Sequence, residues 1–191
     1  LLANKYDCVV ANPPYMGRAY HNPNLKDFIK VNYKNHDSDV FSAFILRNIE
    51  LTKNSGHCGF MSPFVWMFIS SHESLRTRLI DNTNITSLVQ LEYSGFAEAT
   101  VPICTFTIQN GHVPGYVGSY IRLSDFKGSE NQGPKTLEAI NNPECGWLYR
   151  TSADNFHKIP GSPIAYWASK RFLEIFAQAK SLGEIGETRL G

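Results

Sequence analysis

The sequence predicts an α/β fold with a largely parallel sheet, and two observations support this prediction. Residues 6–11 form a mostly apolar run, β-branched at its centre, which is typical of a buried parallel strand and must end at Pro13 and Pro14. A helical pattern over residues 40–53 then separates this strand from a second apolar run at residues 58–63. The order strand, helix, strand predicts a right-handed parallel βαβ unit.

The segment between the prolines and the long helix contains a shorter predicted helix. Four apolar residues follow helical spacing there, namely Leu25, Phe28, Ile29 and Tyr33. Beside them runs a stripe of three lysines, Lys26, Lys30 and Lys34. With Arg18, this stripe either neutralises phosphates or is an ordinary solvated face. Ser38 or Asp39 is the expected N-cap of the long helix, and Gly56 is expected to end it.

Three further helices are predicted along the chain. The first covers residues 71–81, with Arg76 and Arg78 on its outward face. A short one covers residues 136–140, and an amphipathic one covers residues 169–180.

Three strands are expected in the second half of the sheet. The runs at residues 85–91 and 103–108 are joined by a short connection without a helix, so we expect antiparallel neighbours. Asn110 and Gly111 form a turn signal, after which residues 116–123 are predicted to return as a hairpin strand.

Between residues 124 and 163 the regular spacing of apolar residues is lost, and Gly, Pro, Asn and Ser are frequent. We therefore predict one α/β unit over residues 1–123, followed at residues 124–191 by a linker and the start of a further region. Four aromatic residues in the second part could stack on bases or pack between domains; they are Trp147, Tyr149, Tyr166 and Trp167.

Composition limits the function classes. Eighteen Lys and Arg residues against 17 Asp and Glu give a net charge of +1, so no global field attracts nucleic acid, and any contact with DNA is expected to be local or supplied elsewhere. Four widely spaced cysteines without a metal-ligand pattern favour buried free thiols in a reducing cytoplasm, with no metal. No run reaches membrane length and no signal peptide is recognisable.

The turn after the first strand carries the predicted chemistry. Asn12 offers an amide oxygen and Pro13 a main-chain carbonyl, while Pro14 fixes the turn and Tyr15 provides an aromatic face. Two fixed acceptors could hold a planar exocyclic amine and favour its nucleophilic form. In an open α/β sheet, ligands bind beyond the carboxyl ends of the strands, where this turn would lie.

Asn12-Pro13-Pro14-Tyr15 after an apolar strand resembles the catalytic motif of S-adenosylmethionine-dependent N6-adenine DNA methyltransferases. The continuation Met-Gly, the lysine-rich helix, Ser-Asp before the long helix and a late Ile-Pro-Gly-Ser-Pro resemble the methyltransferases of BREX phage-exclusion systems (PglX-like) and fused restriction-modification enzymes. The resemblance implies the carboxy-terminal half of a Rossmann-like methyltransferase sheet, with one antiparallel strand near the edge. It also implies that residues 1–123 are the catalytic half and that residues 124–191 are a linker and the start of a carboxy-terminal target-recognition region. The cofactor-binding half is expected to lie elsewhere, since no glycine-rich loop follows a strand and the chain opens without Met.

The resemblance also implies roles for individual residues. Phe96 matches a loop phenylalanine that packs on the extruded adenine, and Val40 and Phe44 match positions that touch the cofactor adenine. The implied reaction is direct: the N6 amine of a flipped adenine, held by Asn12 and Pro13 and stacked on Tyr15, attacks the methyl of S-adenosylmethionine.

The implied partners are double-stranded DNA, the rest of the parent polypeptide and other defence-system proteins. The isolated chain is expected to be inactive, because the glycine loop and the acidic ribose-binding residue of the family are not in it. Two other readings stay open. Glutamine-N5 and RNA guanine-N2 methyltransferases use the same motif on other planar nitrogens. A non-catalytic DNA-binding scaffold of a defence complex is the third class.

Overall fold

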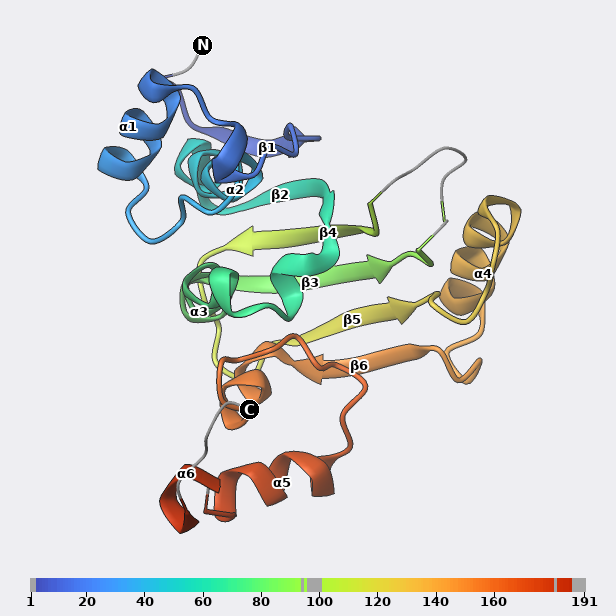
Figure 1. Cartoon of the computed structure of the whole chain (residues 1–191). Helices are drawn as coiled ribbons and strands as arrows, with labels where there is room; N and C mark the ends of the chain where they lie inside the picture. The colour runs from blue at the N-terminus through green and yellow to red at the C-terminus, as the bar shows by residue number, and fades with distance from the viewer. Residues whose placement is uncertain (1–2, 94, 96–100, 181, 187–191) are drawn as a thin grey trace.

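The computed structural model describes residues 3–93, 95, 101–180 and 182–186. Within them, six strands form one mixed sheet with the order β1-β2-β4-β3-β5-β6 (Figure 1). The strands are β1 (Tyr6–Ala11), β2 (Thr52–Pro63), β3 (Thr83–Gln90), β4 (Ile103–Asn110), β5 (Val117–Arg122) and β6 (Leu148–Ser152). The α-helices are α1 (Pro23–Asn32), α2 (Val40–Leu51), α3 (Glu73–Asn82), α4 (Ser129–Asn141), α5 (Lys170–Gln178) and α6 (Leu182–Ile185).

The predicted α/β class and its first unit are confirmed. β1 and β2 are parallel neighbours joined by α2, and β3 and β4 are antiparallel neighbours. The antiparallel strand is placed differently from the prediction, because β4 lies between β2 and β3 inside the described sheet. β6 is a second antiparallel strand, paired with β5.

The predicted hairpin of residues 116–123 is wrong. The turn at Gly111 forms, with φ at 115°, but the chain then crosses to the other side of β3, and β5 pairs with β3 in parallel. Asn84 holds this crossing, since its side-chain oxygen accepts a hydrogen bond from the Val113 amide at 2.9 Å. A Cβ at Gly118 would collide with the Ile85 carbonyl oxygen, so only glycine permits this close pairing.

Gly56 does not end the long helix. The α2 helix ends at Leu51, and β2 begins at once with Thr52. A Cβ at Gly56 would lie 2.9 Å from the Asp7 carbonyl oxygen and 3.0 Å from that of Lys53. The glycine is therefore required for the close approach of β2 to β1, a contact between strands that the helix pattern does not report.

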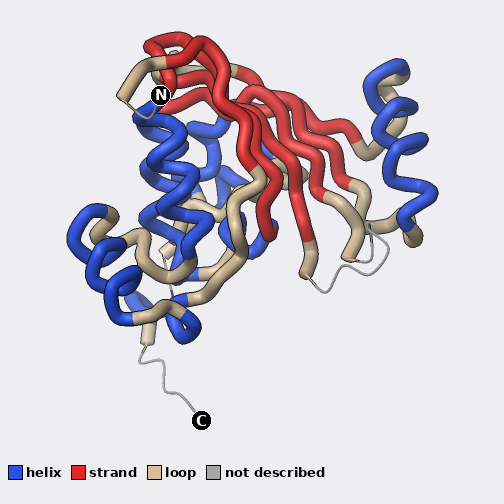
Figure 2. Tube along the Cα trace, turned by 90° about the horizontal axis from the view of Figure 1, so that it is seen from above, coloured by secondary structure: helices blue, strands red, loops and turns tan. Residues whose placement is uncertain are grey.

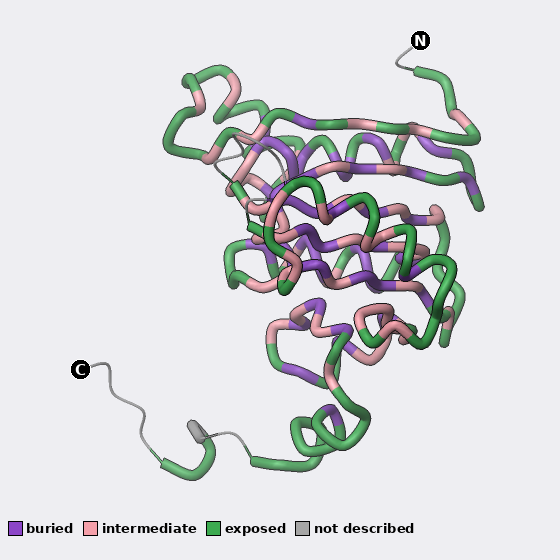
Figure 3. The backbone as a smooth tube through the Cα atoms, turned by 90° about the vertical axis from the view of Figure 1, so that its right-hand side faces the viewer, coloured by how far each residue is buried: buried purple, intermediate pink, exposed green. Residues whose placement is uncertain are grey.

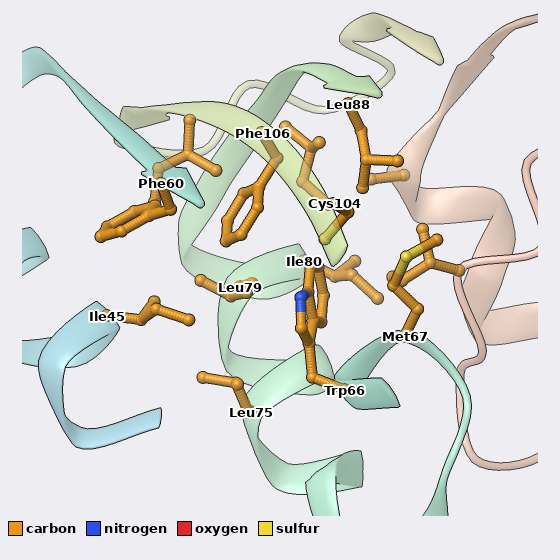
Figure 4. Close-up of a cluster of buried hydrophobic side chains, with 14 of the residues drawn as sticks. Ile45, Phe60, Trp66, Met67, Leu75, Leu79, Ile80, Leu88, Cys104 and Phe106 are labelled. Carbon is orange, nitrogen blue, oxygen red and sulfur yellow. The ribbon is translucent and has the colours of Figure 1, made fainter. Parts of the chain in front are cut away.

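The two faces of the sheet are covered unequally. Seen from above, most helices lie on one side of the sheet and a single helix lies on the other (Figure 2). The main core lies on the first side, where side chains of α2 and α3 meet those of the strands. Figure 4 shows part of this core, including Leu79 of α3, Phe106 of β4 and the fully buried Trp66. On the opposite side, α4 covers one end of the sheet through Ala139.

Arg76 is not on the outward face of its helix, as the pattern predicted. It is 1% exposed and donates four hydrogen bonds to main-chain carbonyls, those of Trp66, Ile69 and twice Gly161, at 2.7 to 3.0 Å. Arg78 is exposed as expected. The buried guanidinium thus connects α3 to two segments far apart in the sequence.

The chain beyond residue 123 contributes to the same sheet and core. β6 extends the sheet, and Phe156, Ile164 and Tyr166 belong to the main core. The helix predicted at residues 136–140 is longer, because the Gln132 side chain donates to the carbonyls of Phe126 and Gly128 and anchors its first turn. The chain around α5 is largely exposed (Figure 3). No described helix is long and apolar enough to cross a membrane.

Candidate active site

The turn after β1 presents its polar groups outward. Asn12 is exposed, Pro13 is buried and Tyr15 is half-buried. The Tyr15 hydroxyl donates a hydrogen bond to Asn12 Oδ1 over 3.2 Å. The side-chain oxygen of Asn12 is therefore a hydrogen-bond acceptor that faces solvent and lies next to the Tyr15 ring.

The turn is fixed to the start of α2 by Asp39. Its carboxylate accepts hydrogen bonds from the amides of Phe41 at 3.1 Å and Met16 at 3.0 Å, so the predicted N-cap is confirmed and holds the turn as well. The Val40 amide also donates to the Met16 carbonyl at 3.1 Å. Burial raises the pKa of Asp39, although both amide hydrogen bonds favour its charged form.

Tyr15 lies where the two cores meet. It packs against the main core on one side and against the cluster under α4 on the other. Burial, and secondarily Cys104, raises the pKa of the phenol, so it stays protonated at neutral pH and remains a donor. The ring is therefore held at the end of the sheet.

A hollow of about 440 Å³ lies beside Asn12 on the less covered face of the sheet. Val10, Met61 and Thr105 are among the side chains that line it. Val10 is 77% exposed although it belongs to an apolar strand, because β1 forms an edge of the described sheet and little covers it there.

The two residues expected to touch a cofactor line one apolar hollow between α1 and α2. Its volume is about 240 Å³, and Val40 and Phe44 share it with Leu25, Phe28 and Tyr33. Val40 is 5% exposed and packs inward, whereas Phe44 is 44% exposed. Of the two, Phe44 has the surface that a flat ring could cover.

Phe96 lies outside the described residues. The described ends of its connection are both fixed: the Glu92 amide donates to Gln132 Oε1 at 3.0 Å, and the Pro102 carbonyl accepts from the Phe64 amide at 3.0 Å. Sequence reasoning missed Gln132, which sits in a segment expected to be a linker and is 6% exposed. An isolated glutamine carries no local signal for such a contact.

Other predicted features are placed as follows. Arg18 forms an ion pair with Asp37 at 3.1 Å, which reduces its availability for phosphates. Cys58 and Cys104 are buried free thiols as expected, but Cys8 is exposed on the edge strand. Among the described residues, no group of three or more His, Cys, Asp or Glu could hold a metal ion.

Comparisons with known proteins agree on one family. The sequence model of the Eco57I restriction-modification methylase family matches residues 1–96. The adenine-specific methyltransferase PglX of Lacticaseibacillus casei (strain Zhang) is 38% identical over 177 residues, and BrxX of Escherichia coli O9:H4 (strain HS) is 36% identical over 186 residues. These alignments cover 91% and 96% of this chain but 15% of each relative.

A solved structure shows the same fold. The methyltransferase subunit of the type I restriction-modification system from Streptococcus thermophilus superimposes with a TM-score of 0.63 at 17% sequence identity. The superposition covers 85% of this chain and 38% of that chain, which confirms the predicted methyltransferase sheet. The chain, which spans about 15% of the length of the curated relatives it matches, belongs to the Eco57I restriction-modification methylase family.

Proposed function

We propose that this chain contains, in residues 1–123, the catalytic half of an N6-adenine DNA methyltransferase of the restriction-modification or BREX type. The observation that carries the proposal is the turn after β1, where exposed Asn12 and half-buried Tyr15 stand together at the carboxyl end of a strand. Relatives named adenine-specific methyltransferases support the choice of target. The rest of the parent polypeptide and the duplex would complete the site.

Asn12 and Pro13 would hold the exocyclic amine of a flipped adenine. Asn12 Oδ1 accepts the Tyr15 hydroxyl at 3.2 Å, and the amine would replace this donor. The Pro13 carbonyl accepts no hydrogen bond within the part of the chain that the structure describes. Two acceptors on one amine keep electron density on the nitrogen, which increases its nucleophilicity.

Tyr15 and Pro14 would set the position of the base. The ring of Tyr15 is fixed by two packed clusters, so it can stack on a flat base with little loss of side-chain entropy. Pro14 fixes the backbone between the acceptors and the ring. Phe96 is proposed as the opposite wall of the base site.

The residues present fit the family's methyl donor in part. S-adenosylmethionine, when bound, supplies an electrophilic methyl group that needs no further activation. Phe44 would pack on its adenine ring, because this side chain is 44% exposed beside an apolar hollow of about 240 Å³. Val40 would support Phe44 from the buried side of the same helix.

The test is Asn12→Ala in the full-length protein, with methyl incorporation at adenine N6 as the measurement. Removing one preorganised acceptor should lower the rate about 100-fold or more while cofactor affinity stays similar. Asn54→Ala is the matched control, because Asn54 is an exposed asparagine in β2. Near-normal turnover by Asn12→Ala, or methylation of glutamine or guanine instead of adenine, would contradict the proposal.

The isolated 191-residue chain is proposed to be inactive. It spans about 15% of the length of its curated relatives, and no glycine-rich loop follows a strand in its sequence. Adenine methylation by the purified chain alone would refute this part of the proposal.

A further inference from the structure

A basic hollow lies at the edge of the sheet opposite the proposed catalytic turn. It has a volume of about 390 Å³ and is bounded by β6, the 3₁₀ segment Ala153–Lys158 and α5. Figure 1 shows β1 and β6 at opposite edges of the sheet, with α5 beyond β6. The hollow is thus separate from Asn12 and from the cavity between α1 and α2.

Three cations converge on this hollow from three different elements. Arg150 comes from β6, Lys158 from the 3₁₀ segment and Lys170 from α5. None of the described residues that line the hollow is acidic. In a chain whose net charge is only +1, three cations around one cavity form a local positive field.

These cations are weakly neutralised. Lys158 Nζ donates to the Asn155 side-chain oxygen at 2.7 Å, a neutral partner. Lys170 lies 3.9 Å from a carboxylate oxygen of Glu174, which is a long contact between exposed groups. For Arg150, the described residues supply no ion-pair partner. The positive charge is therefore available to an anionic ligand.

Trp167 gives the hollow an aromatic wall. It is 37% exposed, and its indole is held between the Arg122 guanidinium at 5.1 Å and the Phe68 ring at 5.7 Å. Tyr166 meets it edge-on, with the centroids 4.9 Å apart and the planes at 87°. A partly exposed indole fixed on several sides is preorganised for stacking.

The same contacts connect the hollow to the ligand-binding end of the sheet. Arg122 is the last residue of β5, and the Tyr166 hydroxyl donates to the side-chain oxygen of Gln90, the last residue of β3, at 2.7 Å. The aromatic wall therefore begins at the carboxyl ends of β3 and β5, and the turn at Asn12 lies at the carboxyl end of β1, on the same side of the sheet. Five strand spacings separate β1 from β6, which is about 24 Å or about seven nucleotides of one DNA strand.

We infer that this hollow binds the sugar-phosphate backbone of the DNA substrate at a distance from the methylated base. The cations would contact phosphates and Trp167 would pack against a sugar or base, a combination suited to sequence-independent affinity. The inference rests on the proposed function, since it takes DNA as the ligand. Free nucleotides share this chemistry, and the experiment distinguishes the two sources.

The experiment changes Arg150, Lys158 and Lys170 to Gln together in the full-length protein. We expect the Kd for an adenine-containing duplex at low salt to rise about 10- to 100-fold. The slope of log K against log salt should fall by about two to three. The kcat at saturating DNA should stay within about two-fold, because the site does not touch the reacting atoms.

Lys53, Arg78 and Lys127, which are exposed and do not line this hollow, give the matched control when changed to Gln together. An unchanged Kd in the first variant, or an equal loss in both, would overturn the inference. Loss of dAMP binding with unchanged DNA affinity would identify a free nucleotide as the ligand and also overturn it. If the wild-type protein binds the duplex and the triple variant loses affinity as expected, but the wild-type protein does not methylate adenine, only the proposed function fails.

Discussion

Neighbouring residues of β3 and β4 point to opposite faces of the sheet, and the two faces are packed differently. On the face covered by α2 and α3, Leu88 and Ile108 are 0% exposed. On the other face, Val89 and Thr107 are only half-buried. The Thr107 hydroxyl lies 2.6 Å from Thr86 Oγ1 and 2.7 Å from Ser87 Oγ, so these hydroxyls satisfy one another there.

The two faces therefore have different roles: the covered face stabilises the fold, and the open face stays accessible beside the candidate site. Large apolar side chains fill the covered face, where burial contributes most to stability. The open face carries hydroxyl side chains and partly exposed apolar ones such as Val10 and Met61, which line the hollow of about 440 Å³ next to Asn12. Substitutions that disturb the covered face should therefore act on stability first, and those on the open face much less.

The largest effect is expected for Arg76→Met, which removes the charge that connects the covered face to the segment around Gly161. Three main-chain carbonyls, of which that of Trp66 is buried and the other two are part-buried, would lose their donor. The free energy of unfolding should fall by about 3 kcal/mol or more. Urea denaturation measures this change, with Arg78→Met on the exposed side of the same helix as the control. A loss below about 1 kcal/mol for Arg76→Met would show that the buried guanidinium is not required.

A matched pair on β3 tests the comparison of the faces directly. Leu88→Ala removes a fully buried side chain of the main core and should lower the free energy of unfolding by about 2–4 kcal/mol. Val89→Ala, one residue further on and half-buried on the open face, should cost about 1 kcal/mol or less. Equal shifts of the urea midpoint for both variants would mean that the two faces contribute alike.

Local patterns predicted the parts of the fold that local forces decide. The βαβ unit, the N-cap at Asp39 and the antiparallel pair of β3 and β4 follow from apolar runs, capping chemistry and connection length. Long-range contacts decided the rest. Arg76 is buried because its guanidinium donates to the Gly161 carbonyl, 85 residues away, as well as to two nearer carbonyls. β5 passes to the far side of β3 because Gly118 permits the approach.

The candidate site was predictable to a similar depth. Two prolines and the strand before them indicate an outward turn, and the structure has Asn12 exposed with Tyr15 beside it. The turn is also held by the hydrogen bond from the Met16 amide to Asp39, and this contact depends on how the turn folds back on α2. The pattern identifies Asp39 as a cap but gives no signal for this partner.

A smaller effect than that of Arg76→Met or Leu88→Ala is expected from pH, on the covered side, where His72 is 5% exposed. Its Nδ1 lies 3.2 Å from both Ser38 Oγ and Ser42 Oγ. Burial, then the nearby Arg76 and His36, lowers the pKa of His72 from 6.5 to about 4. The folded protein therefore keeps the imidazole neutral, while the unfolded chain protonates it below pH 6.5.

The sign follows from proton binding. Stability from neutral His72 is present above pH 6.5 and is lost as the pH falls toward 4, because only the unfolded state gains the proton in that range. We expect the free energy of unfolding to drop by about 1–2 kcal/mol between pH 7 and pH 5. His72→Gln should reduce this decrease in stability at acid pH without abolishing it, since burial also lowers the pKa of His36. Urea midpoints at both pH values measure the effect, and an identical acid loss in His72→Gln would show that the buried imidazole does not cause it.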